Sequence, residues 1–220
     1  MGLFSKLFKP KEKSLPNDVR QAFDRMLKIL NTDDMQNQLF LSPALKNKIL
    51  AGHPCDQVPN PKGGFGYSTQ NPIPVNGAVG ELTYLSRLQR EKSKQHIIFH
   101  RLGSGNVGGG IAVDIYEVAS LDGGYWGLLM FDMYHPVKSK QTPEGYIFAD
   151  RVEGFTGTNK YLDKFPSGIL EATRETATSL MIPVVNPVVA KNINLVKLVR
   201  PSEHAAIVQG IRQELERLKA

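Results

Sequence analysis

Cysteine and tryptophan occur only once each in this chain of 220 residues, and long apolar runs are missing. With Cys55 as its only cysteine, the chain cannot form an internal disulfide, which agrees with a reducing compartment. No apolar run approaches the roughly 18 residues that a bilayer-spanning helix needs. The first residues also lack the apolar core of a signal peptide. The sequence therefore predicts a cytoplasmic protein.

The basic charge is concentrated at the start of the chain. The formal net charge is +6, and residues 1–13, with four lysines and one glutamate, carry +3 of it. The remaining body carries only +3, so a basic nucleic-acid surface spread over the fold is not indicated. We do not expect nucleic acid to be a partner.

Residues 1–13 are predicted to form a basic amphipathic tail, and residues 14–220 a single α+β domain. Apolar side chains in the tail recur at helical spacing beside lysines, which favours binding to an unknown partner protein or to the inner face of an anionic membrane. The residues concerned are Leu3, Phe4, Lys6, Leu7, Phe8 and Lys9. The alternative is a short tail that packs on its own domain or frays, because a segment of about eight residues is marginal as an isolated helix.

The centre of the chain predicts a meander of antiparallel strands. Three segments are rich in β-branched and aromatic residues and are bounded by turn residues: Gln95–Leu102, Ile111–Ser120 and Tyr125–Tyr134. Asp122 and Gly123 favour a two-residue type I′ turn between the second and third of them, which places Glu117 opposite Leu128. The third segment is so apolar that we expect it to be central and covered on both faces.

The predicted register groups polar residues on the two faces of the meander. If the glycine loop closes Leu102 onto Ile111, then His100 and Asp132 both lie opposite Val113. One face then carries His96, His100, Glu117 and Asp132, and the other carries Arg101, Asp114 and Tyr116. A slip of one residue would reverse this grouping.

The complete fold prediction is α+β, with an antiparallel meander of four to five strands at about 80–150 between two N-terminal and two C-terminal helices. Glu81–Leu88 is predicted as its first strand and Tyr146–Val152 as an added edge strand. The helices are expected at Asp18–Leu30, from Ser42 to Gly52, from Ser167 to Pro183 and from Ser202 to about Lys219. A further short helical turn is expected within Asn31–Leu41, and an extended segment at Asn192–Val199.

Residues 53–79 form a long connection that is rich in proline and glycine. Regular structure is nearly excluded there, and a connection of this length is usually functional or disordered. It also contains Phe65 and Tyr67, which we expect to anchor the loop on the body of the protein. A role in ligand binding is one interpretation of these aromatic residues, and packing alone is the other.

Histidines and carboxylates of the meander are the candidate chemical groups. His100 and Asp132 would form the acid–base pair of a small hydrolase or transferase. The candidate ligand-binding residues are Phe65, Tyr67, His96, Glu117 and His135. The alternative is that these polar groups satisfy one another beneath the helices. Their spacing matches no metal motif, so we expect neither a metal nor a cofactor.

Two sequence motifs suggest a chemical function that the residues around them do not support. Residues 103–108 match GxGxxG, but the dinucleotide-binding use of that pattern needs a helix next, and here a strand follows. The remaining kinase motifs are also missing, so we expect a flexible hairpin loop. His53 and Cys55 are separated by a proline, and we interpret Cys55 as a structural cysteine. The leading hypothesis is therefore a binding or adaptor module of bacterial type without catalysis of its own, and the hydrolase or transferase is the alternative.

Overall fold

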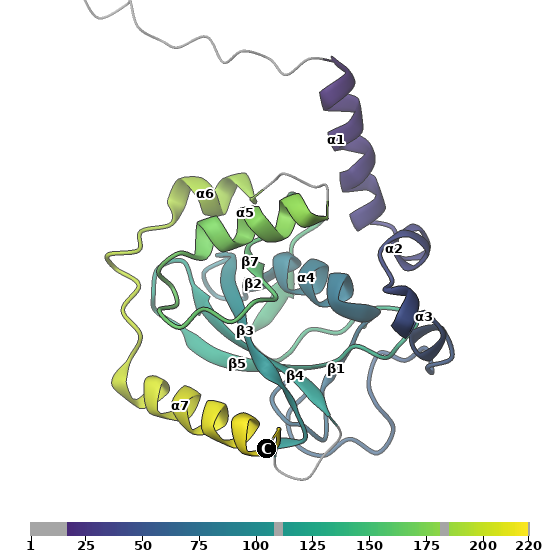
Figure 1. Cartoon of the computed structure of the whole chain (residues 1–220). Helices are drawn as coiled ribbons and strands as arrows, with labels where there is room; N and C mark the ends of the chain where they lie inside the picture. Colours follow the sequence, from purple (N-terminus) through teal and green to yellow (C-terminus); the bar gives the residue numbers. More distant parts are fainter. Residues whose placement is uncertain (1–16, 108–111, 181–184, 220) are drawn as a thin grey trace, which may run out of the picture.

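The computed structural model describes residues 17–107, 112–180 and 185–219, which form an α+β fold (Figure 1). The predicted tail at residues 1–13 lies outside the described residues. The helices are α1 (Asn17–Leu30), α2 (Asp33–Leu39), α3 (Pro43–Leu50), α4 (Gly77–Arg87), α5 (Ile169–Ser179), α6 (Pro187–Asn192) and α7 (Ser202–Arg217). The strands are β1 (Ile73–Pro74), β2 (Leu88–Arg90), β3 (Ile97–Gly105), β4 (Val113–Ser120), β5 (Trp126–Asp132), β6 (Tyr146–Phe148) and β7 (Gly157–Thr158).

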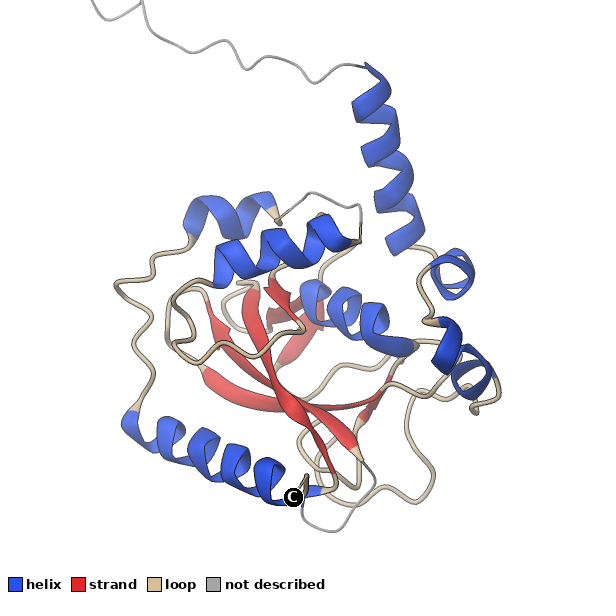
Figure 2. Cartoon of the chain, viewed as in Figure 1, coloured by secondary structure: helices blue, strands red, loops and turns tan. Residues whose placement is uncertain are grey.

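The main sheet has five strands in the order β1-β5-β4-β3-β7. The meander β3-β4-β5 is antiparallel as predicted, but β1 and β7 pair in parallel with its outer strands, so the sheet is mixed. Helix α4 packs on one face, with Leu82 and Leu85 against Tyr116 of β4. Helix α7 packs on the other face, with Leu215 against Ile115. Figure 2 shows these two helices on opposite sides of the strands, and α1 standing away from them.

The register between β4 and β5 is confirmed, because Glu117 lies opposite Leu128. The turn itself differs from the prediction. Ser120 and Tyr125 close the hairpin, and of the two central residues only Gly123 has a positive φ, of 74°. The Asp122 side chain stabilises the loop by accepting hydrogen bonds from Ser120 Oγ at 2.6 Å and from the Gly124 amide at 3.0 Å. A different turn therefore preserves the same pairing.

The register between β3 and β4 was predicted wrongly. His100 lies opposite Glu117 and not opposite Val113, because β3 continues through the glycines as far as Gly105. The shift is four residues, an even number, so the two predicted faces survive it. Arg101 and Asp114 do form an ion pair on the face that they were expected to share.

The first two glycines of the GxGxxG match, Gly103 and Gly105, lie where the backbone of β3 packs closely against α7. A Cβ atom at Gly103 would lie 2.9 Å from Leu215 Cδ1, and one at Gly105 would lie 2.6 Å from Leu215 Cδ2. Leu215 is fully buried on the inner face of α7. These glycines therefore let α7 approach the hairpin closely, and they belong to β3 rather than to a flexible loop.

Substitution of Gly105 by alanine tests this interpretation. We expect it to lower the free energy of unfolding by about 1–3 kcal/mol, because the new methyl group overpacks against Leu215. Leu215→Ala should relieve much of that cost, so that a double-mutant cycle in urea denaturation gives a clear coupling energy. Gly210 of α7 has open space around it, and Gly210→Ala is the control that should not couple to Leu215. Additive effects of Gly105→Ala and Leu215→Ala would contradict the packing role.

Helices α1, α3, α5 and α7 lie close to their predicted ranges, and α2 is the expected short turn. Glu81–Leu88, by contrast, is almost entirely helix and not a strand. Every residue from Val79 to Ser86 is buried, so the segment carries no apolar stripe to reveal its helical period. The predicted edge strand in Tyr146–Val152 is also wrong, because β6 pairs with β2 in a separate two-stranded sheet.

Two smaller predictions fail at the margins of the fold. The fully buried strand is β4, whereas β5 carries mostly half-buried residues and was expected to be covered on both faces. Along α7, Ile207 and Leu218 are about half exposed, because Val208 and Leu215 face the sheet instead. Helix α6 ends at Asn192, and no strand follows in Asn192–Val199 within the described residues.

Candidate functional site: the Glu81 pocket

The predicted pair of His100 and Asp132 is not formed. His100 Nε2–H donates to Glu117 Oε2 at 2.7 Å, and His100 Nδ1 accepts from the Leu162 amide at 3.0 Å. Both ring nitrogens of His100 are thus occupied. Asp132 belongs to a different cluster, with His135. The expected grouping depended on the β3–β4 register, which the longer β3 alters.

Glu117 joins β4 to α7 through a buried network. Its carboxylate accepts from Arg200 Nε at 2.7 Å and from Arg200 Nη2 at 2.8 Å, and His204 Nε2 lies 3.2 Å from Glu117 Oε1. Burial alone would raise the pKa of Glu117, but hydrogen bonds from His100 and His204 and the charge of Arg200 lower it to about 2. Burial lowers the pKa of His100. Since His100 and Glu117 are fully buried, the network favours the alternative in which these groups satisfy one another.

Asp132, His135 and Cys55 form a second cluster, which superficially resembles the constellation of a thiol nucleophile. His135 donates from Nε2 to Asp132 Oδ2 at 3.1 Å and from Nδ1 to the carbonyl of His53 at 2.7 Å, and Cys55 Sγ lies 3.5 Å from Nδ1. Burial would lower the pKa of His135, but the hydrogen bonds to Asp132 and His53 raise it above its ordinary value. The contacts of His135 with Asp132 and with the carbonyl of His53 therefore hold the loop around Cys55 in place.

Cys55 is not activated by this arrangement. Burial, followed by the negative charges of Asp132 and Asp56, raises the pKa of its thiol. A nucleophilic cysteine needs the opposite shift, because the thiolate is the reactive form. The interpretation of Cys55 as a structural residue thus agrees with its surroundings.

The rate at which iodoacetamide alkylates Cys55 measures directly whether its thiol is activated. At pH 7.5 the folded protein should react more slowly than a free thiol, since each unit by which the pKa rises lowers the thiolate fraction about tenfold. Asp132→Asn should accelerate the reaction because it removes a nearby negative charge. The urea-unfolded chain serves as the control. If Cys55 of the folded protein reacts faster than a free thiol at pH 6.5, the thiol is an activated nucleophile instead.

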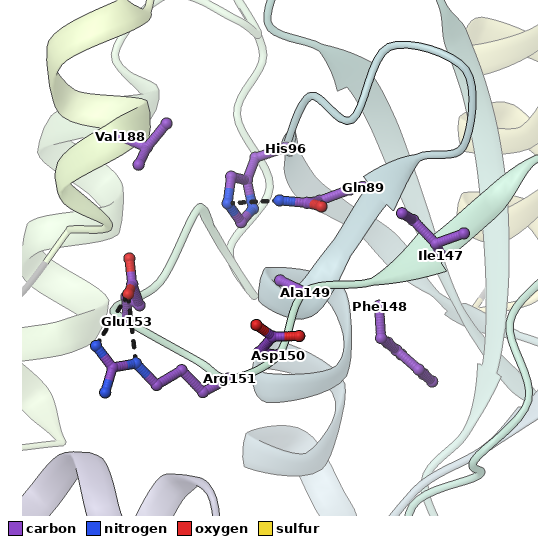
Figure 3. Close-up of a pocket in the computed structure, with 9 residues that line it drawn as sticks. All are labelled: Gln89, His96, Ile147, Phe148, Ala149, Asp150, Arg151, Glu153 and Val188. Atoms are coloured by element: carbon purple, nitrogen blue, oxygen red, sulfur yellow. Dashed lines mark hydrogen bonds and ion pairs between the residues drawn. The ribbon is translucent and has the colours of Figure 1, made fainter.

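A cavity of about 720 Å³ lies around the predicted residue His96 (Figure 3). His96 is buried, its Nε2 lies 3.2 Å from the side-chain nitrogen of Gln89, and burial lowers its pKa. The charged residues Arg151 and Glu153 at the cavity wall bind each other, with Arg151 exposed and Glu153 half-buried. Asp150, which is exposed, is the third charged residue of the wall, and His96 Nδ1 is a buried atom without a hydrogen-bond partner among the described residues.

The 53–79 connection is not free of regular structure, contrary to the prediction, because it contains β1 and the start of α4. Its aromatic residues attach it to the body, as expected. Phe65 packs against the main core, and Tyr67 donates from its hydroxyl to the carbonyl of Glu144 at 2.7 Å. The carbonyl of Gly66 accepts from the amide of Met130 in β5 at 2.9 Å. These contacts account for both aromatic side chains by packing, and a role in ligand binding stays a prediction.

A smaller cavity, of about 310 Å³, is lined by the buried carboxyl groups of Glu81 and Asp114, and we call it the Glu81 pocket. It lies between α3, α4 and the face of the sheet that α4 covers. Its polar wall consists of Glu81 from α4, Arg101 and Ser104 from β3, and Asp114 from β4, with Asn159 nearby. The rest of the wall is largely apolar or aromatic: Leu45, Ala78, Ala112, Phe131, Met133 and Tyr134.

The acidic groups of the Glu81 pocket are buried and only half satisfied. Glu81 is 1% exposed, and its Oε2 accepts from the Tyr116 hydroxyl at 2.7 Å. Asp114 is 4% exposed, and its Oδ1 accepts from Arg101 and from Ser104. Among the described residues, Glu81 Oε1, Asp114 Oδ2 and Arg101 Nε have no hydrogen-bond partner of their own.

Burial is the main reason that the pKa of Glu81 lies well above its ordinary value. The charge of Asp114 and a hydrogen bond to it raise this pKa further, and they outweigh Tyr116 and Arg101, which lower it. The neutral form of the Glu81 carboxyl group is therefore favoured. Strongly shifted groups of this kind gather at functional sites, although structural networks also produce them.

Glu81 was missed in the sequence although its three neighbours on the sheet were grouped correctly. The segment that contains it was interpreted as a strand, which gave no reason to direct its side chain toward Asp114. One signal was available, because Glu81 is the only charged residue between Asn71 and Ser86. An isolated carboxyl group in an otherwise uncharged, buried segment must either lose its charge or find a partner.

Comparison with protein-family models, with curated proteins and with solved structures finds no match to this chain. Within the described ranges, no helix is long and apolar enough to cross a membrane. In the same part of the chain, no group of three or more His, Cys, Asp or Glu side chains is arranged to hold a metal ion. The function must therefore be argued from the geometry of the Glu81 pocket.

Proposed function

We propose that this protein binds a small organic molecule in the Glu81 pocket. The proposal keeps the binding role of the leading hypothesis but assigns it to the body of the protein. The predicted contact with a partner or a membrane through Leu3 to Lys9 lies outside the described residues and stays a prediction. No reaction is included, because the thiol of Cys55 is held in its unreactive form and His100 is sealed in the core.

The observation that carries the proposal is the convergence of unpartnered polar atoms on one cavity. Glu81 Oε1, Asp114 Oδ2 and Arg101 Nε belong to residues that line the same 310 Å³ space. A buried polar group without a partner costs about 1–3 kcal/mol, so a ligand that pairs with these atoms recovers a free energy that the free protein lacks. A few convergent polar groups in a largely apolar wall are typical of small-molecule sites.

The dimensions of the pocket limit the ligand. Ligand pockets span about 300–1,000 Å³, and this one lies at the lower end. Phe131, Met133 and Leu45 supply an apolar surface on the side away from the charged groups. We infer a ligand of metabolite size with a polar end and an apolar body.

A fragment screen by protein-observed NMR tests the proposal, with a steric block as the comparison. Ala78 lines the pocket from α4, and Ala78→Phe should fill it, so fragments that shift the amide signals of Glu81 and Asp114 should lose at least about tenfold in affinity. Ala22→Phe on the exposed part of α1 is the matched control and should bind the same fragments unchanged. A screen without hits at these residues, or hits that bind Ala78→Phe equally well, would contradict the proposed function.

A further inference from the structure

Resting on the proposed function, we infer that the ligand of the Glu81 pocket carries a primary ammonium group, which donates hydrogen bonds to Glu81 Oε1 and Asp114 Oδ2. The two unpartnered carboxyl oxygens, Glu81 Oε1 and Asp114 Oδ2, are both acceptors when the groups are ionised. A donor with a positive charge satisfies both atoms at once and balances the negative charge of an ionised Glu81.

The balance of charge around the pocket favours a cation over an anion. Arg101 is already paired with Asp114, so ionisation of Glu81 would leave one negative charge without compensation. A proton neutralises that charge in the free protein, and an ammonium group would neutralise it in the complex. An anionic ligand would instead add a second negative charge beside two buried carboxyl groups, which is costly at low dielectric.

The titratable groups around Glu81 come from β3, β4, α3 and the segment that follows β5. Asp114 and Tyr116 face it from β4, and Arg101 faces it from β3. Tyr134, which follows β5, lines the same pocket, and Lys48 of α3 is engaged over the ring of Tyr134 at 3.5 Å from the centroid. Among these groups the Glu81 carboxyl is the acid that can lose its proton to accommodate a cation, because a tyrosine hydroxyl is ordinarily a much weaker acid than a carboxyl group.

The mechanism is an exchange of one proton for one ligand. Glu81 releases its proton to solvent, the carboxylate stays hydrogen-bonded to the Tyr116 hydroxyl, and the ammonium group donates to Glu81 Oε1 and Asp114 Oδ2. No covalent bond to carbon, nitrogen or sulfur changes. Because binding releases a proton, the affinity must rise with pH as long as Glu81 is protonated in the free protein.

Three probes of similar shape distinguish the ligand classes: benzylamine, benzyl alcohol and benzoate. Benzylamine should bind, and its dissociation constant should fall about tenfold for each pH unit over the range in which Glu81 is protonated. Calorimetry in two buffers with different ionisation enthalpies should report about one proton released for each amine bound. Benzyl alcohol should show no such dependence, and benzoate should bind most weakly.

Glu81→Gln is the decisive variant, because glutamine keeps the shape and the hydrogen bond to Tyr116 but cannot become an anion. It should lose benzylamine binding by at least about tenfold while its affinity for benzyl alcohol is unchanged. Glu171→Gln, at an exposed position on α5, should leave all three affinities as they are. Preferential binding of benzyl alcohol or benzoate, a pH-independent affinity for the amine, or no binding of any probe would overturn this inference. Fragment hits that still depend on Ala78 would leave the proposed binding function standing.

Discussion

Glu117→Gln should lower the free energy of unfolding by about 3–5 kcal/mol, which is the cost of removing one partner from a buried ion pair. The change leaves the guanidinium of Arg200 without its anion, and His100 loses its charged acceptor. We expect the lower end of the range, because the Arg200 side chain is 20% exposed and water can solvate it in part. Equilibrium denaturation in urea at pH 7 measures the difference.

The matched control for Glu117 is Glu153→Gln. Glu153 forms an exposed ion pair with Arg151, and such pairs contribute about 0–1 kcal/mol. Equal losses of stability at the two positions would show that the buried network does not hold α7 to the sheet.

The same network predicts a loss of stability in acid. The pKa of Glu117 is about 2 in the folded protein, below its ordinary value of 4.5. Its contribution is therefore fully present above pH 4.5 and is lost as the pH falls toward 2. A shift of this size corresponds to a contribution on the order of 3 kcal/mol. Between pH 6 and pH 3, the free energy of unfolding should fall more steeply with decreasing pH for the wild type than for Glu117→Gln.

The second large effect has the opposite sign and occurs at higher pH. The pKa of Glu81 is raised in the folded protein, so between its unfolded value near 4.5 and its folded value the folded chain holds a proton that the unfolded chain has released. The contribution of Glu81 is thus present below about pH 4.5 and is lost as the pH rises through this window. The slope reaches about 1.4 kcal/mol per pH unit for one proton.

Glu81→Gln should remove this slope, because its neutral amide imitates the protonated acid at every pH. It can accept from Tyr116 and donate to Asp114, so we expect a variant that is as stable as the wild type near pH 4.5 and more stable at pH 8. Urea denaturation across this range gives the comparison, and Glu171→Gln on the surface of α5 controls for the loss of one carboxylate. Parallel stability curves for the wild type and Glu81→Gln would mean that Glu81 ionises normally in the fold.

The sequence predicted the parts of the fold that depend on local signals. The strand-forming residues on both sides of Asp122 and Gly123, together with the turn signal of these two residues, place Glu117 opposite Leu128. This register is right even though the turn has another geometry. Helices with a polar face, such as α1 and α7, were recognisable from their period. Arg101 and Asp114 could be placed on one face because alternation along a strand survives an even shift in register.

The remaining parts depend on contacts that are distant in the sequence. Helix α4 is buried all round, so its apolar positions have no period to detect. His100 meets Glu117 only because β3 extends through two glycines to accommodate Leu215, which lies more than a hundred residues further along the chain. Arg200 reaches Glu117 from a sequence separation of 83 residues. Local patterns carry no information about such pairs.

The protonation state of Glu81 is the most direct test of this account. A ¹³C NMR titration of the side-chain carboxyl groups of glutamate, compared between the wild type and Glu81→Gln, isolates its signal. We predict one carboxyl resonance, absent from the variant, that titrates well above 4.5 and moves to lower pH when benzylamine is bound. A Glu81 signal that titrates at or below its ordinary value in the free protein would contradict the account, because the pocket would then hold no proton for a ligand to replace.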